Sequence, residues 1–131
     1  MEPTTRLVLE DSEVAAVVAA EQGVRIRLSA AHVLRSEVSG GQAVPGFARA
    51  VELWLSGALL QAAPGGCIGR IDQGRVCIEG RWASQLALPG AWDGPIMLEL
   101  AFANRAQLQL QAWGLACRYR GEANFSESLS C

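Results

Sequence analysis

Side chains that could carry out acid–base or nucleophilic chemistry are few in this sequence. The chain contains a single histidine, His32. One histidine could serve as a general base, but it cannot build a histidine-rich metal site. The sequence contains no Gly-x-Ser-x-Gly nucleophile elbow, no lysine-containing phosphate loop and no His-Glu-x-x-His motif. We therefore favour a non-enzymatic role without a cofactor or a bound metal. An enzyme that uses His32 with a nearby carboxylate is the weakest of three hypotheses.

The four cysteines form no disulfide or metal motif that can be read from their spacing. They are Cys67, Cys77, Cys117 and Cys131, and no two have the Cys-x-x-Cys spacing. The first residues lack the basic region and apolar stretch of a secretory signal. We therefore expect a cytoplasmic protein. Because cytosolic thiols stay reduced, we also expect Cys77 and Cys117 to be buried, reduced thiols.

Two of the four tryptophans are the best candidates for a binding site. Trp82 and Trp92 lie on either side of a turn at Pro89–Gly90, and each has a charged neighbour, Arg81 or Asp93. Aromatic rings beside polar groups can stack on a sugar ring, a base or a partner protein. The second hypothesis is therefore a β-sandwich that binds a small ligand or a carbohydrate at these residues.

The other two tryptophans lie in strand-like runs. Trp54 falls on the polar side of its run, between Glu52 and Ser56, where a large aromatic residue is out of place. We therefore include Trp54 among the candidate ligand- or partner-binding residues. Trp113 stands next to a predicted bend, and we expect it to be part of the core.

The clearest pattern in the chain is the alternation of apolar and polar residues, which predicts half-buried β-strands. The alternating runs cover residues 24–28, 51–55 and 108–112. Each run is followed by small residues, which mark bulges or bends inside long strands. We expect bends at Ala30, Gly57 and Gly114, where a strand could pass from one sheet to another.

Turn-forming residues divide the remaining sequence into hairpins. The predicted hairpins pair 14–20 with 24–30 and 68–71 with 76–78, and a predicted meander joins 96–102, 107–111 and 115–120. The fold class is all-β, an antiparallel β-sandwich or partly open barrel of about eight or nine short strands. The alternative is an α+β domain in which 14–20 or 29–35 is a short helix. We expect one domain over residues 1–121 and a flexible C-terminal tail over 122–131.

Composition narrows the classes of partner. The chain has 131 residues, a net charge of −2 and no lysine, and half of its residues are hydrophobic. Without a basic patch we expect no nucleic-acid partner, and no apolar run is long enough to span a membrane. The leading hypothesis is an intracellular, bacterial-type binding or assembly module that forms homo-oligomers or binds a protein partner.

Overall fold

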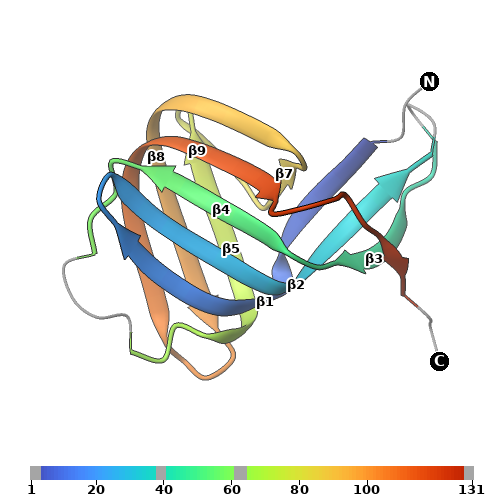
Figure 1. Cartoon of the computed structure of the whole chain (residues 1–131), viewed down its shortest axis with the longest axis horizontal. Coiled ribbons are helices and arrows are strands. Elements are labelled where there is room, and N and C mark those ends of the chain that lie inside the picture. Colours follow the sequence, from blue (N-terminus) through green and yellow to red (C-terminus); the bar gives the residue numbers. More distant parts are fainter. Residues whose placement is uncertain (1–3, 38–40, 61–64, 129–131) are drawn as a thin grey trace.

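The chain folds into antiparallel β-strands, as predicted, and the computed structural model contains no helix in the residues that it describes, 4–37, 41–60 and 65–128 (Figure 1). The strands in chain order are β1 (Thr4–Ala20), β2 (Gly23–Ser36), β3 (Val44–Ala48), β4 (Val51–Ser56), β5 (Gly69–Ile78), β6 (Arg81–Ala83), β7 (Gln85–Ala87), β8 (Gly90–Phe102), β9 (Gln107–Tyr119) and β10 (Ser126–Glu127).

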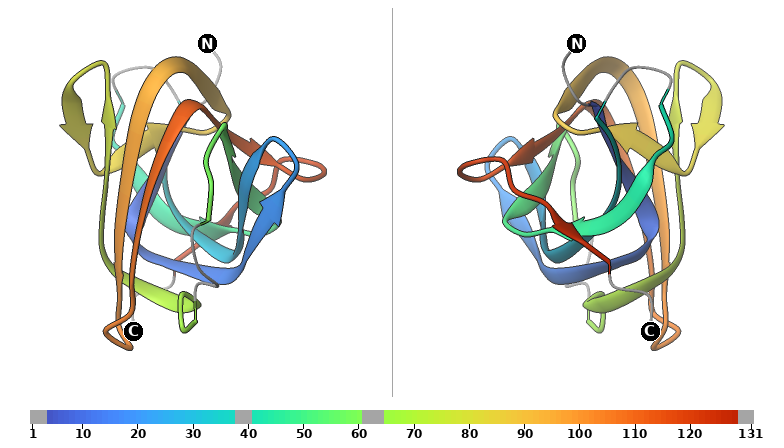
Figure 2. Two further views of the ribbon diagram at one scale, coloured as in Figure 1. Left: turned by 90° about the vertical axis from the view of Figure 1, so that its left-hand side faces the viewer. Right: turned by 90° about the vertical axis from the view of Figure 1, so that its right-hand side faces the viewer.

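A six-stranded barrel forms the body of the molecule. Its strands follow the order β1-β2-β4-β9-β8-β5, and β5 returns to β1 where Arg70 pairs with Glu13 and Gly69 pairs with Val14. Figure 2 shows β8 and β9 curving along one side of this barrel, with β1 and β2 on another. Because strand pairing continues from β5 to β1, the sheet closes on itself as a barrel does.

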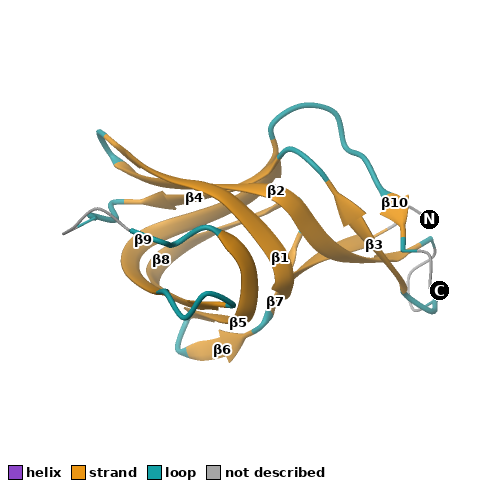
Figure 3. Cartoon of the chain, turned by 90° about the horizontal axis from the view of Figure 1, so that it is seen from below, coloured by secondary structure: helices purple, strands orange, loops and turns teal. Residues whose placement is uncertain are grey.

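A smaller set of strands extends the sheet to one side of the barrel (Figures 1 and 3). The far half of β2, Ala31–Arg35, leaves β4 and pairs with β3, and β10 pairs with β3 in turn. The first residues of β1 pair with β7, through Arg6–Val8. The long strands β1 and β2 therefore belong to both the barrel and this extension.

The bend predicted at Gly114 appears as a change in which residues of β9 face inward. Before the bend the buried positions include Leu110 and Ala112, whereas after it they are Leu115 and Cys117. Side chains alternate between the two faces of a strand, so this one-residue shift moves the inward-facing set from even to odd positions. β8 has its register irregularity opposite this point.

The bends predicted at Ala30 and Gly57 show the same shift. In β2 the buried residues change from Leu28 to Ala31, and β2 exchanges β4 for β3 as its partner at this point. Gly57 has a φ of +74°, which favours glycine, and β4 ends just before it. Ala58 is the next buried residue.

The core fills the barrel and continues beneath the extension. Fully buried aliphatic side chains come from both ends of the chain and include Leu7, Leu9, Ile26, Leu53, Leu55, Ile71, Leu98 and Leu100. Burial of this continuous apolar surface is the main force that holds the strands together.

Several predicted boundaries are wrong because turn-forming residues lie inside continuous strands. Residues 68–78 do not form a hairpin, since β5 runs from Gly69 to Ile78 with an irregularity between Ile71 and Gln73. The three-stranded meander is a pair, β8 and β9, and the latter includes both of its last two predicted strands. The two segments considered for helices lie in β1 and β2. In these cases the pairing of neighbouring strands overrides local turn preference.

Part of the predicted C-terminal tail, residues 122–131, contacts the rest of the sheet. β10 pairs with β3 through Ser126 and Phe47, and Phe125 packs against the core. The side chain of Asn124 also accepts a hydrogen bond from the backbone N–H of Arg49, at 2.8 Å. Residues 129–131, including Cys131, lie outside the described residues.

Candidate functional site

The structure separates the two tryptophans predicted to share a binding site. Trp82 lies on β6 opposite Cys77, on the outer face of the sheet, and 45% of its surface is exposed. Trp92 lies on β8 opposite the buried Leu115, and it packs against the core with its ring above Gly90. The two rings face opposite sides of the sheet and do not form one platform.

Their charged neighbours are also apart. Arg81 is exposed on β6 opposite Ile78, and Asp93 is exposed on β8 opposite Gly114. No ion pair joins Arg81 to Asp93. Of the four residues predicted around this turn, Trp82 is the one that belongs to the surface described below.

Trp54 lies on the outer face of β4, as predicted, but neighbouring residues cover part of its ring. The Arg25 guanidinium stands 5.4 Å from the ring centroid, and the ring edge lies over Gly23. Beside it is Glu52, whose carboxylate is almost buried and contacts Arg25 at 2.9 Å and Arg118 at 3.2 Å. Trp54 is therefore part of a packed cluster around a carboxylate.

Trp113 is not a core residue, contrary to the expectation from sequence. It is 70% exposed and lies on the outer face of β9, beside Gly57. The physical reason is that the alternation of β9 shifts only after Trp113, at Gly114, so Trp113 continues the outward-facing set of Gln107, Gln109 and Gln111. A large aromatic side chain is consequently placed in solvent.

The His32 ring contacts a backbone carbonyl and an aromatic ring. Its Nδ1 lies 3.0 Å from the backbone carbonyl oxygen of Glu10, and its ring centroid lies 5.7 Å from that of Phe47. Its backbone N–H donates to the buried hydroxyl of Ser12, which donates in turn to the carbonyl of Val8. Among the described residues no carboxylate is hydrogen-bonded to the His32 ring, so the arrangement that catalysis by His32 required is not found there.

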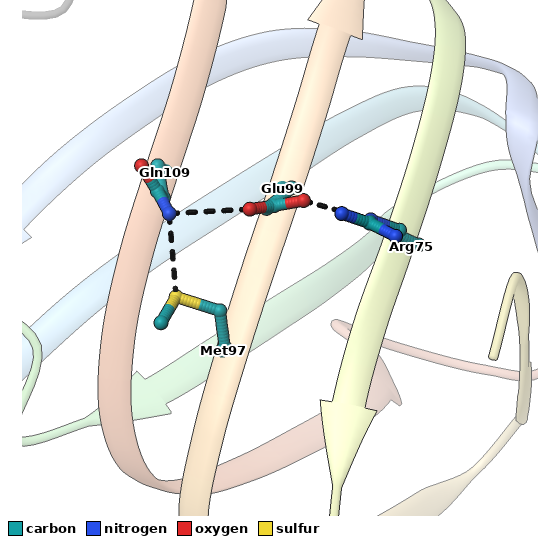
Figure 4. Close-up of polar contacts among 4 residues, drawn as sticks. All are labelled: Arg75, Met97, Glu99 and Gln109. Atoms are coloured by element: carbon teal, nitrogen blue, oxygen red, sulfur yellow. Dashed lines mark hydrogen bonds and ion pairs between the residues drawn. The ribbon is translucent and has the colours of Figure 1, made fainter. Parts of the chain in front are cut away.

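A row of hydrogen-bonded polar side chains crosses the outer face of three barrel strands (Figure 4). Arg75 of β5, Glu99 of β8 and Gln109 of β9 are direct cross-strand neighbours. Glu99 accepts from Arg75 Nε at 2.7 Å and from Gln109 Nε2 at 3.1 Å. The Arg75 guanidinium also stacks 4.0 Å from the centroid of the Trp82 ring. We call Arg75, Glu99 and Gln109 the polar row.

Trp82, Cys77 and Met97 form a second row beside the polar row on the same face, which we call the apolar row. Cys77 stands opposite Trp82 on one side and Met97 on the other, and Met97 stands opposite Gln111. Met97 links the two rows, because Gln109 Nε2 lies 3.7 Å from its sulfur (Figure 4). Cys77 was expected to be buried, but it is half-buried here because it points outward from β5.

Three grooves hollow this outer face. One, of about 500 Å³, lies over the polar row and is lined by Gln73, Gly74, Arg75, Glu99, Leu100, Ala101, Gln107, Leu108 and Gln109. A second, of about 380 Å³, lies between the apolar row and Trp113 and is lined by Cys77, Gly80, Pro95, Ile96, Met97, Gln111, Ala112 and Trp113. A third, of about 630 Å³, follows β9 from Gln107 to Trp113 and includes Leu59, which is 79% exposed.

Two buried thiols, Cys67 and Cys117, have raised pKa values and keep their protons. Burial raises the pKa of Cys117 to about 12. Burial also raises the pKa of Cys67, whose Sγ lies 3.6 Å from the backbone oxygen of Gln107. Within residues 4–37, 41–60 and 65–128, no group of three or more histidine, cysteine or carboxylate side chains is placed to bind a metal ion.

Sequence reasoning missed most of the residues on this face. The alternation alone places Glu99 and Gln109 on the polar face, and Gln107, Gln109 and Gln111 stand at alternate positions in one strand. That pattern places three amides on one face of β9. The two-residue turn Glu79–Gly80 is a local signal that places Trp82 beside Cys77, but nothing local shows that the strand with Arg75 joins Glu99 and Gln109.

None of the described segments contains a helix with the length and apolar character needed to cross a membrane. Comparison of the chain with protein-family models, with curated proteins and with solved structures gives no match, so the site's own geometry must support any functional assignment.

Proposed function

We propose that this chain is a non-enzymatic, cytoplasmic binding module that associates with a second copy of itself through the surface around Trp113. The observation that carries the proposal is the exposure of Trp113 at 70% and of Leu59 at 79% along one groove of the outer face. Its cytoplasmic location rests on the sequence alone.

The composition of this surface supports a protein interface. Trp113 and Met97 line the second and third grooves together, and Cys77 and Pro95 complete the apolar side of the second. Aromatic residues and methionine are enriched at the centres of protein interfaces, whereas charged residues are depleted there. Neither groove is lined by a charged side chain.

The shape of the surface favours a second copy over an unrelated partner. Trp113 projects into solvent directly beside the groove that also contains Met97 and Pro95. In a two-fold dimer each surface meets itself, so the projecting ring of one copy can enter the groove of the other. The absence of charge from both grooves means that two identical surfaces meet without repulsion between like charges.

Sedimentation velocity at micromolar concentrations tests this proposal. We expect the wild-type chain to sediment as a dimer of the 13.9 kDa protomer. Because tryptophan at the centre of an interface contributes about 2 kcal/mol or more, Trp113→Ser should raise the dimer dissociation constant about 30-fold or more. Phe47→Ser is the matched control, since Phe47 is a 40% exposed aromatic on β3, outside these grooves.

Two results would contradict the proposal. One is a wild-type chain that stays monomeric throughout the concentration range. The other is a dimer that Trp113→Ser leaves intact or that Phe47→Ser weakens equally. Circular dichroism of each variant establishes whether it is folded. We expect Trp113→Ser to fold, because the side chain that it replaces is 70% exposed.

A further inference from the structure

The groove over the polar row has chemistry different from the surface around Trp113, and it points to a second binding site. Its polar lining consists of three amides, one guanidinium and one carboxylate, from Gln73, Gln107, Gln109, Arg75 and Glu99. Each amide side chain presents both donors and an acceptor, and the guanidinium presents several donors in one plane. We propose that this groove binds a neutral ligand with adjacent hydroxyl groups, namely a carbohydrate.

The polar row is held in position before any ligand arrives. Arg75 is fixed by Glu99 on one side and by the Trp82 ring on the other. Gln109 is fixed by Glu99 and Met97. Side chains already ordered in the free protein lose little further freedom when they bind, which favours recognition through hydrogen bonds.

The row retains hydrogen-bonding capacity after these contacts are made. The Arg75 contact to Glu99 uses Nε, which leaves the two terminal nitrogens of the guanidinium as donors. The Gln109 contacts use Nε2, which leaves its Oε1 as an acceptor. The free donors of Arg75 and the free acceptor of Gln109 stand on β5 and β9 with β8 between them, about two strand spacings or 9–10 Å apart, so they can bind hydroxyl groups at two separate places along one extended ligand.

The electrostatics of the groove favour a neutral ligand. Arg75 and Glu99 are its charged lining residues and form an ion pair with each other at 2.7 Å. An anionic ligand at the guanidinium would be repelled by the Glu99 carboxylate, and a cationic ligand at the carboxylate would be repelled by the Arg75 guanidinium. Trp82 and Met97 adjoin the row outside the lining of this groove, where Trp82 holds the Arg75 guanidinium and Met97 contacts Gln109.

Isothermal titration calorimetry with three neutral trisaccharides, cellotriose, maltotriose and mannotriose, tests this inference. We expect at least one of them to bind the wild-type chain with a millimolar or lower dissociation constant. Gln109→Ala removes the free acceptor and should weaken binding about tenfold, since one hydrogen bond is lost. Gln22→Ala is the matched control, because Gln22 is an exposed glutamine in the turn between β1 and β2.

The outcomes separate this site from the proposed self-association surface. Gln109 lines the third groove as well as the groove over the polar row, whereas Arg75 lines the groove over the polar row and neither of the others. Sugar binding that persists in Trp113→Ser, together with a dimer that persists in Arg75→Gln, therefore assigns the two sites independently. The carbohydrate inference is wrong if none of the three sugars binds at millimolar concentration, or if Gln109→Ala and Trp82→Ala both bind as the wild type does. In either case the self-association proposal stands or falls on its own experiment.

Discussion

The buried thiol of Cys117 provides a quantitative test of the core of the barrel. Cys117 is fully buried on β9 opposite Leu53, and its burial raises the pKa of the thiol from an ordinary value of 9.0 to about 12. In the folded protein the thiol therefore keeps its proton at pH 10, whereas in the unfolded chain it is largely ionised at that pH. The native state then binds more protons than the unfolded state, so the free energy of unfolding must fall as pH rises above 9.

The size of the effect follows from the two pKa values. Each pH unit between them corresponds to about 1.4 kcal/mol, so we expect this thiol to cost the protein about 1.4 kcal/mol of stability between pH 8 and pH 10. The assay is urea unfolding at both pH values in the presence of a reductant. Cys117→Ala and Cys117→Val both remove the thiol, and each should lose that much less stability between the two pH values than the wild type loses.

The two variants differ in side-chain volume, so they separate ionisation from packing. Each will have its own stability at pH 8, because a fully buried position responds to cavities and to crowding. The reasoning fails if the wild type and both variants lose the same stability between pH 8 and pH 10. It also fails if the two variants differ from each other in this loss as much as they differ from the wild type.

Two further substitutions test the packing and the charge cluster by urea unfolding. Gly74→Ala would place a Cβ atom 2.8 Å from the Cβ of Leu9 and should destabilise the protein by about 1–3 kcal/mol. The control is Gly121→Ala, whose added Cβ would meet no other side chain or strand within 4 Å and should change stability by less than about 0.5 kcal/mol. Equal effects of the two substitutions would refute this account of the packing at the barrel wall. Glu52→Gln leaves Arg25 and Arg118 without their nearly buried carboxylate. Because both arginines are partly exposed to solvent, the expected loss of stability is about 1–3 kcal/mol, less than for a fully buried ion pair. The control is Asp11→Asn, in an exposed ion pair with Arg70, which should change stability by less than about 1 kcal/mol. A larger loss from Asp11→Asn than from Glu52→Gln would reverse the ranking of these two pairs.

The sequence by itself determined the strand class and the positions of the bends. Alternation in residues 24–28, 51–55 and 108–112 predicts strands because the period of a strand is two, and this property belongs to each segment alone. The bends at Ala30, Gly57 and Gly114 follow from small residues at the ends of these runs. Strand boundaries were less accurate, because residues 72–75 favour a turn locally but are held extended by the pairing of β5 with β8.

Only the tertiary structure decided which side chains share a surface. Trp82 and Trp92 are ten residues apart and are predicted from the sequence to flank one site, yet the sheet places one ring outside and the other against the core. Arg75, Glu99 and Gln109 come from different strands and become neighbours through the register of β5 and β9 on β8. Register is set by pairing across the whole barrel, and a shift of one residue exchanges the two faces of a strand. For that reason the sequence could indicate a bend at Gly114, but the assembled barrel decided that the alternation shifts after Trp113 and leaves its side chain on the outer face.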